Sequence, residues 1–500
     1  MADDRSDMVG FDPEAIRQKL ERISRGEPAR VLDLFSGAGG ISLGFQKSGF
    51  RIDGAVELDP LAARTHAHNF HANHKFVDTH AKARDITTTE PADLVRDFGL
   101  GTVEGSIDVL VGGPPCQAYA RVGRAKLREV AAHPNAFKLD ARGNLYLRYL
   151  AYVRAFQPLA LLIENVPDIL HYAHHNVAEE IVETLEGYGY VAAYSLINAA
   201  FHGVPQMRDR VYLIAYRREL GCQVSFPVAT RHLTLPPGYS GTRAVALRYT
   251  NTEAGYREPD LGTEELPFAV TAQEAIGDLP PIQGESVRRG ARKFDKLARY
   301  REASEAGAYA KLMRDWPGFT SSEGVFDHVI RSLPRDGATF REMPHGAEYP
   351  EAFATAEKIF NRAAKRMKLT SGTVAYVELR KSIVPPYDVA KFPNKWWKLR
   401  PDFPVRTLMA HIGKDTYSHI HYDGAQQRTI SVREAARLQS FPDGFRFAGA
   451  MNAAFRQIGN AVPPLMAFAL AETIREALSA GAGHGAKPDA GQDKSEREAA

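Results

Sequence analysis

The first 220 residues of this 500-residue chain alternate short apolar runs with longer segments of helical periodicity. Each apolar run has the length of a buried strand, and the intervening segments are long enough to form crossover helices. This rhythm predicts an α/β fold with a doubly wound, mostly parallel sheet. The strand candidates are residues 30–35, 52–57, 107–111, 160–164, 191–198 and 211–215.

The rhythm changes after Phe226, where Pro and Gly become frequent and basic runs appear. A chain of 500 residues also exceeds one compact core, so we expect a second, less regular domain. Helical periodicity returns at Ser431, where Ser431 and Glu434 can form a capping box. The predicted parts are an N-terminal extension (1–27), a first domain (28–225), an irregular domain (226–425), a C-terminal segment (426–480) and a disordered tail (481–500).

Composition excludes several classes of protein. The two cysteines, Cys116 and Cys222, rule out a disulfide scaffold and a four-cysteine zinc module, and they fit a reducing compartment. Residues 1–19 mix charges without an apolar core, so they do not form a secretory signal. Since no apolar run approaches the roughly 20 residues that span a bilayer, we expect a cytoplasmic protein with no membrane partner.

Charge is distributed unevenly, although the net charge is only +3. Lys and Arg outnumber Asp and Glu by seven to two in residues 121–148, by seven to one in residues 288–301 and by five to none in residues 358–368. Each run, taken alone, is typical of a solvated helix face.

A glycine-rich turn, Asp33-Leu-Phe-Ser-Gly-Ala-Gly-Gly40, follows the first strand and leads into an amphipathic helix. Glycines there let a ligand approach the backbone at the carboxyl edge of the sheet, although a purely structural turn fits as well. Ser42 stands where the dinucleotide fingerprint has its third glycine. Glu57, twenty residues after Gly37, can accept both hydroxyls of an adenosine ribose.

The segment Asp85-Ile86 is expected to close a third strand, from which the Asp85 carboxylate would reach the exocyclic amine of adenine. An adenosine cradle without a pyrophosphate clamp favours S-adenosylmethionine over a nicotinamide cofactor. A nicotinamide oxidoreductase is therefore the weakest alternative.

Three groups could carry chemistry at the same edge. Cys116 follows an apolar run and two prolines, which places a thiol at the mouth of the sheet, where it suits attack on a substrate. Glu164 ends its strand and suits a proton donor, with a helix N-cap as the alternative. Arg208 and Arg210 precede the last strand, where salt bridging is the alternative to substrate contact.

Four histidines after the second strand, His66, His68, His71 and His74, invite a metal interpretation. Their spacing along one helix favours exposed helix residues instead. No metal site is therefore expected.

Six motifs, taken in order along the chain, resemble those of the bacterial cytosine-C5 DNA methyltransferases. The turn 33–40 is similar to the family's cofactor loop, Pro114-Pro-Cys-Gln117 to its nucleophile loop and Glu164-Asn-Val166 to its acid. Residues 206–210 are similar to its Gln-x-Arg-x-Arg strand, and residues 433–442 and 457–464 to its last two motifs. The resemblance covers nearly all the motifs of the chain and implies the S-adenosylmethionine-dependent methyltransferase fold.

The resemblance implies methyl transfer from S-adenosylmethionine to C5 of a cytosine that is flipped out of duplex DNA. Cys116 would add to C6 of the base, and Glu164 would hold or protonate N3. Arg210 would bind O2, with Arg208 supporting it. The residues implied in cofactor binding are Phe35, Ser36, Gly37, Gly39, Gly40, Glu57, Leu58, Asp85, Ile86, Pro114, Leu145, Asn460 and Val462.

The resemblance also implies roles for the predicted parts. Residues 28–225 would form the catalytic and cofactor-binding domain, and residues 426–480 would return to it. Residues 226–425 would recognise the target, with basic runs and the aromatic residues Phe294, Tyr300 and Phe360 contacting DNA. The basic segment 121–148 is similar to the family's mobile loop. Tyr119-Ala120 stands where the family has Phe-Ser, which removes a hydroxyl near the cysteine.

The expected partner is double-stranded DNA, bound by a monomer in the cytoplasm, with a cognate restriction endonuclease as a further candidate. Two alternatives stay open: the same chemistry on RNA, and a non-catalytic DNA-binding protein of the same fold. The long segment between Arg210 and Arg433 favours DNA. The joint presence of Cys116, Glu164 and Arg210 favours catalysis.

Overall fold

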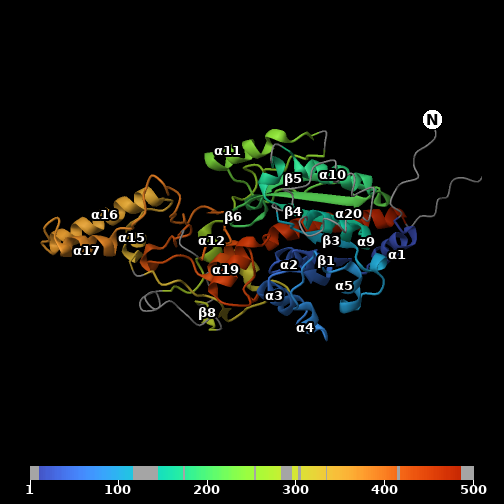
Figure 1. Cartoon of the computed structure of the whole chain (residues 1–500), viewed down its shortest axis with the longest axis horizontal. Helices are drawn as coiled ribbons and strands as arrows, with labels where there is room; N and C mark the ends of the chain where they lie inside the picture. Colours follow the sequence, from blue (N-terminus) through green and yellow to red (C-terminus); the bar gives the residue numbers. More distant parts are fainter. Residues whose placement is uncertain are drawn as a thin grey trace, which may run out of the picture.

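The computed structural model describes residues 11–115, 145–172, 175–252, 255–282, 296–301, 306–333, 335–413 and 417–485. Cys116, most of the basic segment 121–148 and Phe294 lie outside the described residues. A six-stranded sheet forms the centre of the larger body, and a smaller body and a helical arm extend from it (Figure 1).

The sheet has the strand order β2-β1-β3-β4-β7-β5. Strands β2, β1, β3 and β4 pair in parallel, whereas β7 runs antiparallel between β4 and β5. The predicted doubly wound, mostly parallel sheet is therefore confirmed. The strands are β1 (Arg30–Leu34), β2 (Arg51–Val56), β3 (Val109–Gly112), β4 (Ala160–Asn165), β5 (Tyr190–Asn198) and β7 (Asp209–Arg217).

The third strand predicted at Asp85-Ile86 is wrong. These residues lie in an irregular segment and a turn. The Arg84 amide donates to the Glu57 carbonyl at 2.7 Å, which fastens the segment beside the end of β2 without a strand ladder.

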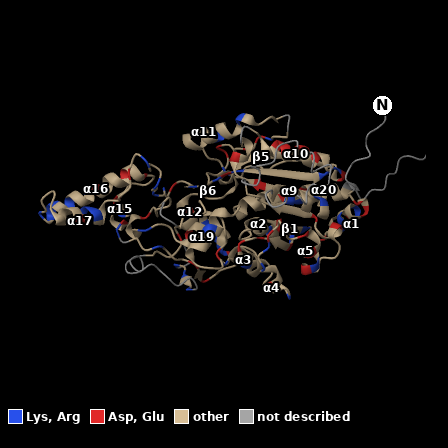
Figure 2. Ribbon diagram, viewed as in Figure 1, with Lys and Arg blue, Asp and Glu red and all other residues tan. Residues whose placement is uncertain are grey.

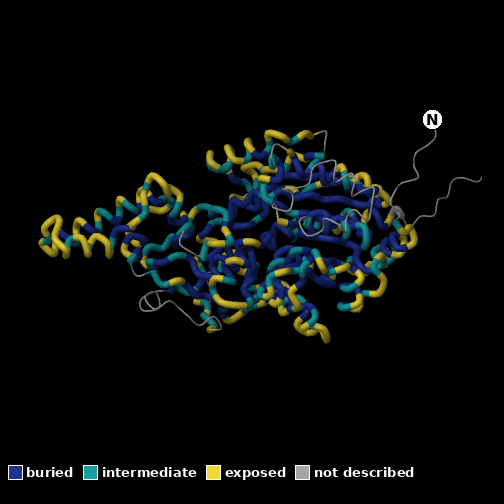
Figure 3. Tube along the Cα trace, in the orientation of Figure 1, coloured by how far each residue is buried: buried dark blue, intermediate teal, exposed yellow. Residues whose placement is uncertain are grey.

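Side chains alternate between two cores along each strand, because successive residues of a strand point to opposite faces. In β3, Val109 and Val111 belong to one core and Leu110 to the other. Figure 3 shows this buried centre in dark blue beneath exposed outer turns. The first core is covered by α1 (Pro13–Ser24), α2 (Gly40–Lys47) and α20 (Pro464–Gly485), the second by α5 (Pro91–Phe98), α9 (Leu145–Phe156) and α10 (Val177–Gly187).

Both ends of the described chain pack on this body. In α1, Ile16 and Leu20 are buried in the first core, and Lys19 Nζ donates to the Phe156 carbonyl at 2.7 Å. Helix α20 continues to Gly485, past the tail expected from residue 481, and buries Ala482. No helix of the described residues is both long and apolar enough to cross a membrane.

The chain after Phe226 first remains beside the sheet. The Tyr194 amide donates to the Gly255 carbonyl at 3.0 Å, and the Arg257 amide donates to the Tyr194 carbonyl at 2.8 Å. This segment therefore covers the outer edge of β5. It contains α11 (Pro237–Ala246), which lies over the same part of the sheet in Figure 1.

The smaller body is built from short elements joined by long loops. Strand β10 (Val405–Arg406) pairs with β6 (Gln206–Met207) and so connects the smaller body to the start of β7. Helices α16 (Tyr349–Arg366) and α17 (Val374–Ile383) form the arm at one end of the molecule (Figure 1). Among the described residues of both bodies, the other α-helices and strands are α3 (Pro60–Phe70), α4 (Val77–His80), α6 (Val103–Ser106), α12 (Ala272–Ile276), β8 (Ala298–Arg299), α14 (Ala308–Arg314), β9 (Gly324–Val325), α15 (Gly337–Glu342), α18 (Val432–Leu438) and α19 (Met451–Asn460).

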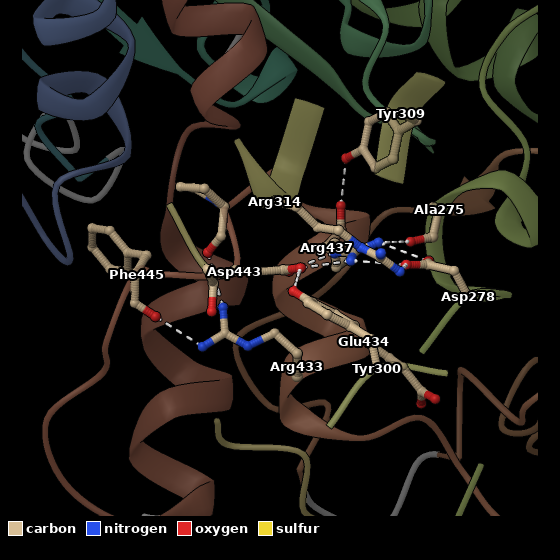
Figure 4. A network of polar contacts seen from close by, with 12 residues as sticks. Ala275, Asp278, Tyr300, Tyr309, Arg314, Arg433, Glu434, Arg437, Asp443 and Phe445 are labelled. Atoms are coloured by element: carbon tan, nitrogen blue, oxygen red, sulfur yellow. Dashed lines mark hydrogen bonds and ion pairs between the residues drawn. The ribbon is translucent and has the colours of Figure 1, made fainter. Parts of the chain in front are cut away.

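Helix α18 is anchored by a fully buried guanidinium group (Figure 4). Arg437 Nε lies 2.5 Å from Asp443 Oδ1, and its Nη1 lies 2.9 Å from Asp278 Oδ1. Burial alone would lower the pKa of Arg437, but these two carboxylates hold it well above its usual value. The predicted capping box of Ser431 and Glu434 at the start of this helix is confirmed.

Candidate active site

A cleft of about 610 Å³ opens at the carboxyl edge of the parallel strands. One wall consists of the turns that follow β1, β2, β3 and β4, and the other consists of residues 408–411 together with the segment 456–462. The cleft brings together most of the predicted site residues: Phe35, Ser36, Gly37, Gly40, Glu57, Leu58, Asp85, Ile86, Pro114, Leu145, Glu164, Arg208, Arg210, Asn460 and Val462.

The glycine-rich turn is shaped by close backbone contacts. Phe35 and Gly37 adopt positive φ values of 58° and 53°, a region that residues with a side chain rarely occupy. A Cβ atom on Gly40 would lie 2.1 Å from the Val462 carbonyl oxygen. Gly40 therefore allows the C-terminal segment to close against the turn and complete the cleft.

Gly39 does not line the cleft formed by the described residues. It has a φ of 93°, and a Cβ atom there would lie 2.4 Å from Phe70 Cε2 and 3.0 Å from His66 Cδ2. The glycine thus permits α2 to pack against α3. That side of the Gly39 backbone faces α3, and the cofactor contact of Gly39 stays a prediction.

Glu57 is held by two backbone donors. The Gly37 amide donates to Glu57 Oε2 at 2.8 Å, and the Asp59 amide donates to Oε1 at 2.7 Å. Burial raises the pKa of Glu57, and both amides oppose that shift. Each carboxylate oxygen keeps capacity to accept a further hydrogen bond. With the aromatic ring of Phe35 and the carboxylate of Asp85 in the same cleft, the residues present fit an adenosine group.

A buried polar trio lies beneath the turn. Ser42 Oγ is 2.6 Å from Asp33 Oδ2 and 2.9 Å from His66 Nε2, so the trio ties together β1, α2 and α3. Burial raises the pKa of Asp33 to about 7. The trio fixes the two helices that flank the glycine-rich turn.

The expectation that the four histidines are exposed is wrong for two of them. His66 and His71 are buried, whereas His68 and His74 are exposed. His71 stacks on His80 with ring centroids 3.7 Å apart. The hydrogen bond to Ser42 accompanies the burial of His66, and ring stacking accompanies that of His71. The described chain contains no group of three or more His, Cys, Asp or Glu side chains that could hold a metal ion.

The other end of the cleft carries an ion pair. Arg210 Nε lies 3.0 Å from Glu164 Oε1, and both side chains are 13% exposed. Arg210 Nη1 also donates to the Asp209 carbonyl at 2.7 Å. The N-cap alternative for Glu164 is wrong, because Glu164 lies within β4 and Val166 precedes the following 3₁₀ helix.

Arg208 joins the two walls of the cleft. It donates to the Leu408 carbonyl and to the Gly459 carbonyl, both at 3.1 Å. Burial lowers the pKa of Arg208 to about 9, with the neighbouring charge of Arg210 adding to the shift. The side chain can therefore position both walls, while Arg210 presents the more accessible guanidinium.

The segment that leads to the nucleophile candidate passes beside Glu164. Asn165 Nδ2 donates to the Pro114 carbonyl at 2.7 Å. A Cβ atom on Gly113 would lie 2.9 Å from Glu164 Oε2. Pro115 lines the cleft, and Cys116 follows it outside the described residues.

The sequence analysis missed part of the lining. Asp59 and Arg456 face each other across the cleft with Arg456 Nη2 2.7 Å from Asp59 Oδ2. Their places, two residues after Glu57 and one before the last motif, could have indicated them. Met409 and His411 follow β10 without a recognisable pattern.

Comparison with known proteins supports the same family. The model of the C-5 cytosine-specific DNA methylase family matches residues 29–476. A putative type II methyltransferase of Oceanobacillus iheyensis, M.OihORF3336P, is 36% identical over 457 residues, which cover 90% of this chain and 96% of that protein. Type II methyltransferase M.AgeI of Thalassovita gelatinovora is 29% identical over 479 residues, which cover 90% of this chain and 100% of that protein.

Among solved structures, a putative DNA modification methyltransferase encoded within an Escherichia coli prophage aligns with a TM-score of 0.53 at 20% identity. The alignment covers 90% of this chain and 99% of that one, and at this identity it supports the fold alone. The motifs, the sheet and the family match over residues 29–476 agree: the chain belongs to the C-5 cytosine-specific DNA methylase family.

Proposed function

We propose that this methyltransferase uses S-adenosylmethionine to methylate C5 of a flipped cytosine in duplex DNA through a covalent bond between Cys116 and C6. One observation carries the proposal. A single cleft joins a pocket with adenosine-binding chemistry to the Glu164–Arg210 pair and to the segment that ends beside Cys116.

S-adenosylmethionine, when bound, would supply the methyl group. Phe35 would contact the adenine ring, Glu57 would accept from the ribose hydroxyls and Asp85 from the adenine amine. The close approach of Gly40 to Val462 would bring Val462 of the C-terminal segment against the cofactor. Leu58, Ile86 and Leu145 would provide its apolar lining.

The charged groups at the other end of the cleft fit a cytosine ring. C5 of cytosine is a weak nucleophile, so the Cys116 thiolate would first bond to C6 while Glu164 holds or protonates N3. Arg210 would donate to O2, and its pairing with Glu164 keeps the two groups at one ring edge. After C5 has taken the methyl group, it would lose its proton, and the C6–sulfur bond would break to release Cys116.

The substrate is expected to be double-stranded DNA, from which the base must be flipped at a cost of about a few kcal/mol. Residues 226–425, with an exposed basic face on α16, would contact the duplex and read the target. We expect a monomer in the cytoplasm, associated with the nucleoid. The type II relatives support a place in a restriction-modification system, with a cognate endonuclease as partner.

The central test compares Cys116→Ser with Cys222→Ser, which changes the other cysteine of the chain. Plasmid DNA from cells expressing each variant is sequenced after bisulfite treatment. We expect methylated cytosines in one sequence context with wild type and Cys222→Ser, and none with Cys116→Ser. Methylation by Cys116→Ser at the wild-type level would refute the covalent mechanism.

Two further assays address the alternatives. Methyl transfer to tRNA in place of plasmid DNA would support the RNA alternative. In duplex DNA that contains 5-fluorocytosine, C5 carries fluorine in place of the proton, so the C6–sulfur bond cannot be released by elimination and a covalent complex should accumulate. Binding to that duplex without covalent capture would support a non-catalytic DNA-binding protein.

A further inference from the structure

Helix α11 lies outside every motif that resembles the family, yet it contacts the start of β7, where Arg210 lies in the strand and Arg208 just before it. Arg243 pairs with the carboxylate of Asp209, the residue between Arg208 and Arg210. The same guanidinium donates to the Leu196 carbonyl of β5 at 3.0 Å. Arg243 therefore bridges β5 and β7 at their cleft end.

Asp209 is fixed from two sides. It pairs with Asn198 in the antiparallel ladder, and Asn198 Nδ2 donates to Asp209 Oδ1 at 3.1 Å. The Asp209 and Arg243 side chains are only 10% and 11% exposed. Because the Asp209 carbonyl accepts from Arg210 Nη1, the place of this residue also determines where the Arg210 guanidinium lies against Glu164.

The same helix reaches the opposite wall of the cleft. The Tyr239 hydroxyl accepts from the Thr407 amide at 3.3 Å, and Thr407 Oγ1 donates to the Met207 carbonyl at 2.8 Å. Thr407 directly precedes Leu408, which lines the cleft and accepts from Arg208. One helix thus contacts both Asp209 at the start of β7 and Thr407 in the segment that faces it.

We propose that α11 is a positioning element of the cytosine end of the cleft, in which Arg243 and Tyr239 are positioning residues. Neither lines the cleft formed by the described residues, so they act through Asp209 and Thr407. Arg243 sets the distance between Arg210 and Glu164, and Tyr239 sets the place of the Leu408 wall. The proposal rests on the function proposed above, because the arginines need a base to hold.

Single-turnover methyl transfer measures this role directly. With saturating cofactor and cognate duplex, Arg243→Met should lower the rate by about 10²-fold, the loss typical of a misplacement near 1 Å. The affinities for S-adenosylhomocysteine and for duplex DNA should stay unchanged, because the turn 33–40 and the basic arm are untouched. Arg243→Lys should recover part of the rate, since a lysine can still pair with Asp209. Tyr239→Phe should cause a smaller loss.

Two matched variants separate positioning from general stability. Arg248→Met changes an exposed residue just beyond α11 and should behave as wild type. The double variant Arg243→Met/Asp209→Asn leaves no buried unpaired carboxylate, so it should fold normally and remain slow. A wild-type rate in Arg243→Met or in the double variant would overturn the proposal, as would loss of cofactor binding in parallel with the rate. An inactive wild-type enzyme would instead refute the proposed function.

Discussion

A Cβ atom added to Gly40 would lie 2.1 Å from a backbone oxygen, whereas one added to Gly372, between α16 and α17, would meet nothing within 4 Å. The helices that follow these glycines differ in the same way. Residues 40–45 of α2 are all buried, and α17 contributes no buried residue. The cleft is thus enclosed by packed backbone, while the arm is a thin two-helix extension (Figure 3).

The packed cleft and the exposed arm suit different kinds of ligand. Packed backbone fixes a pocket to within small tolerances, which suits binding of a small molecule. The arm instead presents exposed cations, seen in blue at the end of the molecule in Figure 2. Changes to the packed backbone of the glycine-rich turn should therefore alter folding and cofactor affinity together, while changes on the arm should alter only long-range attraction to an anionic partner.

The largest loss of stability should follow from Arg437→Met, which removes the buried guanidinium group that anchors α18. Asp443 would remain buried without its guanidinium partner, whereas Asp278 would keep Arg314, whose Nη2 lies 2.6 Å from Asp278 Oδ2. Breaking a buried pair on one side typically costs about 3–5 kcal/mol, and urea unfolding should show such a loss. Arg475→Met changes an exposed arginine in α20 and serves as the control. Equal stability of the two variants would mean that the network contributes little.

The pH dependence of the free energy of unfolding tests whether Asp33 is buried and protonated beneath the glycine-rich turn. Burial raises its pKa from 3.8 in the unfolded chain to about 7, so the folded state retains the proton between these values. The stability that the bound proton provides is fully present below pH 3.8 and is lost progressively as pH rises from there to about 7. Asp33→Asn stays neutral and should escape this loss.

Between pH 5 and pH 8, wild type should lose on the order of 2–3 kcal/mol of unfolding free energy relative to Asp33→Asn, at 1.36 kcal/mol per pKa unit. Urea unfolding of wild type and Asp33→Asn at both pH values gives the difference, in which the titration of other groups cancels. Asp93→Asn, on the exposed side of α5, is the control. If the difference in unfolding free energy between wild type and Asp33→Asn were the same at both pH values, Asp33 would not be buried and protonated.

The strands and the glycine-rich turn could be predicted because their patterns are local. The alternation of apolar runs gave every strand of the central sheet, and the turn was found from residues 33–40 alone. The buried histidines could not be predicted, since the room for His66 is created by Gly39 across the α2–α3 contact. A polar residue was taken as exposed because its partner, Ser42, is 24 positions away.

Contacts between residues far apart in the sequence could not be predicted either. Arg437 and Asp278 are 159 positions apart, and Arg208 and Gly459 are 251 apart, so no local pattern joins them. Asp85 was assigned to a strand because two residues cannot distinguish a strand end from a turn. The α16–α17 arm was missed as well, because residues 226–425 were interpreted as one irregular domain; part of α16 packs within the arm and part against Phe340 and Trp396.

Gly40→Ala tests the close approach that defines the cleft. The new methyl group must displace the Val462 backbone, and such overpacking costs about 1–3 kcal/mol. Calorimetry with S-adenosylhomocysteine should show loss of affinity together with the loss of stability. Gly187→Ala, at the end of α10 with nothing within 4 Å of the added atom, is the control. It should be as stable as wild type or slightly more so.

The smallest effect on folding is expected on the arm. Lys358, Lys365 and Arg366 are exposed on one face of α16, opposite the buried Ala356 and Phe360. With duplex DNA as the substrate, Lys365→Gln/Arg366→Gln should reduce the slope of log affinity against log salt by about 2, because two phosphate contacts are lost. The melting temperature and the rate at saturating DNA should not change.

The arm also offers its own control, Arg380→Gln/Lys381→Gln, which removes the same charge from α17. Arg380 is paired with Glu357 and Lys381 with Glu378, so their cations are already balanced by carboxylates. Exposed pairs of this kind contribute about 0–1 kcal/mol to stability. If both double variants changed the salt slope equally, the arm would act through its total charge, and the α16 face would have no special role. A lower slope for the α16 variant alone would instead identify that face as the DNA contact.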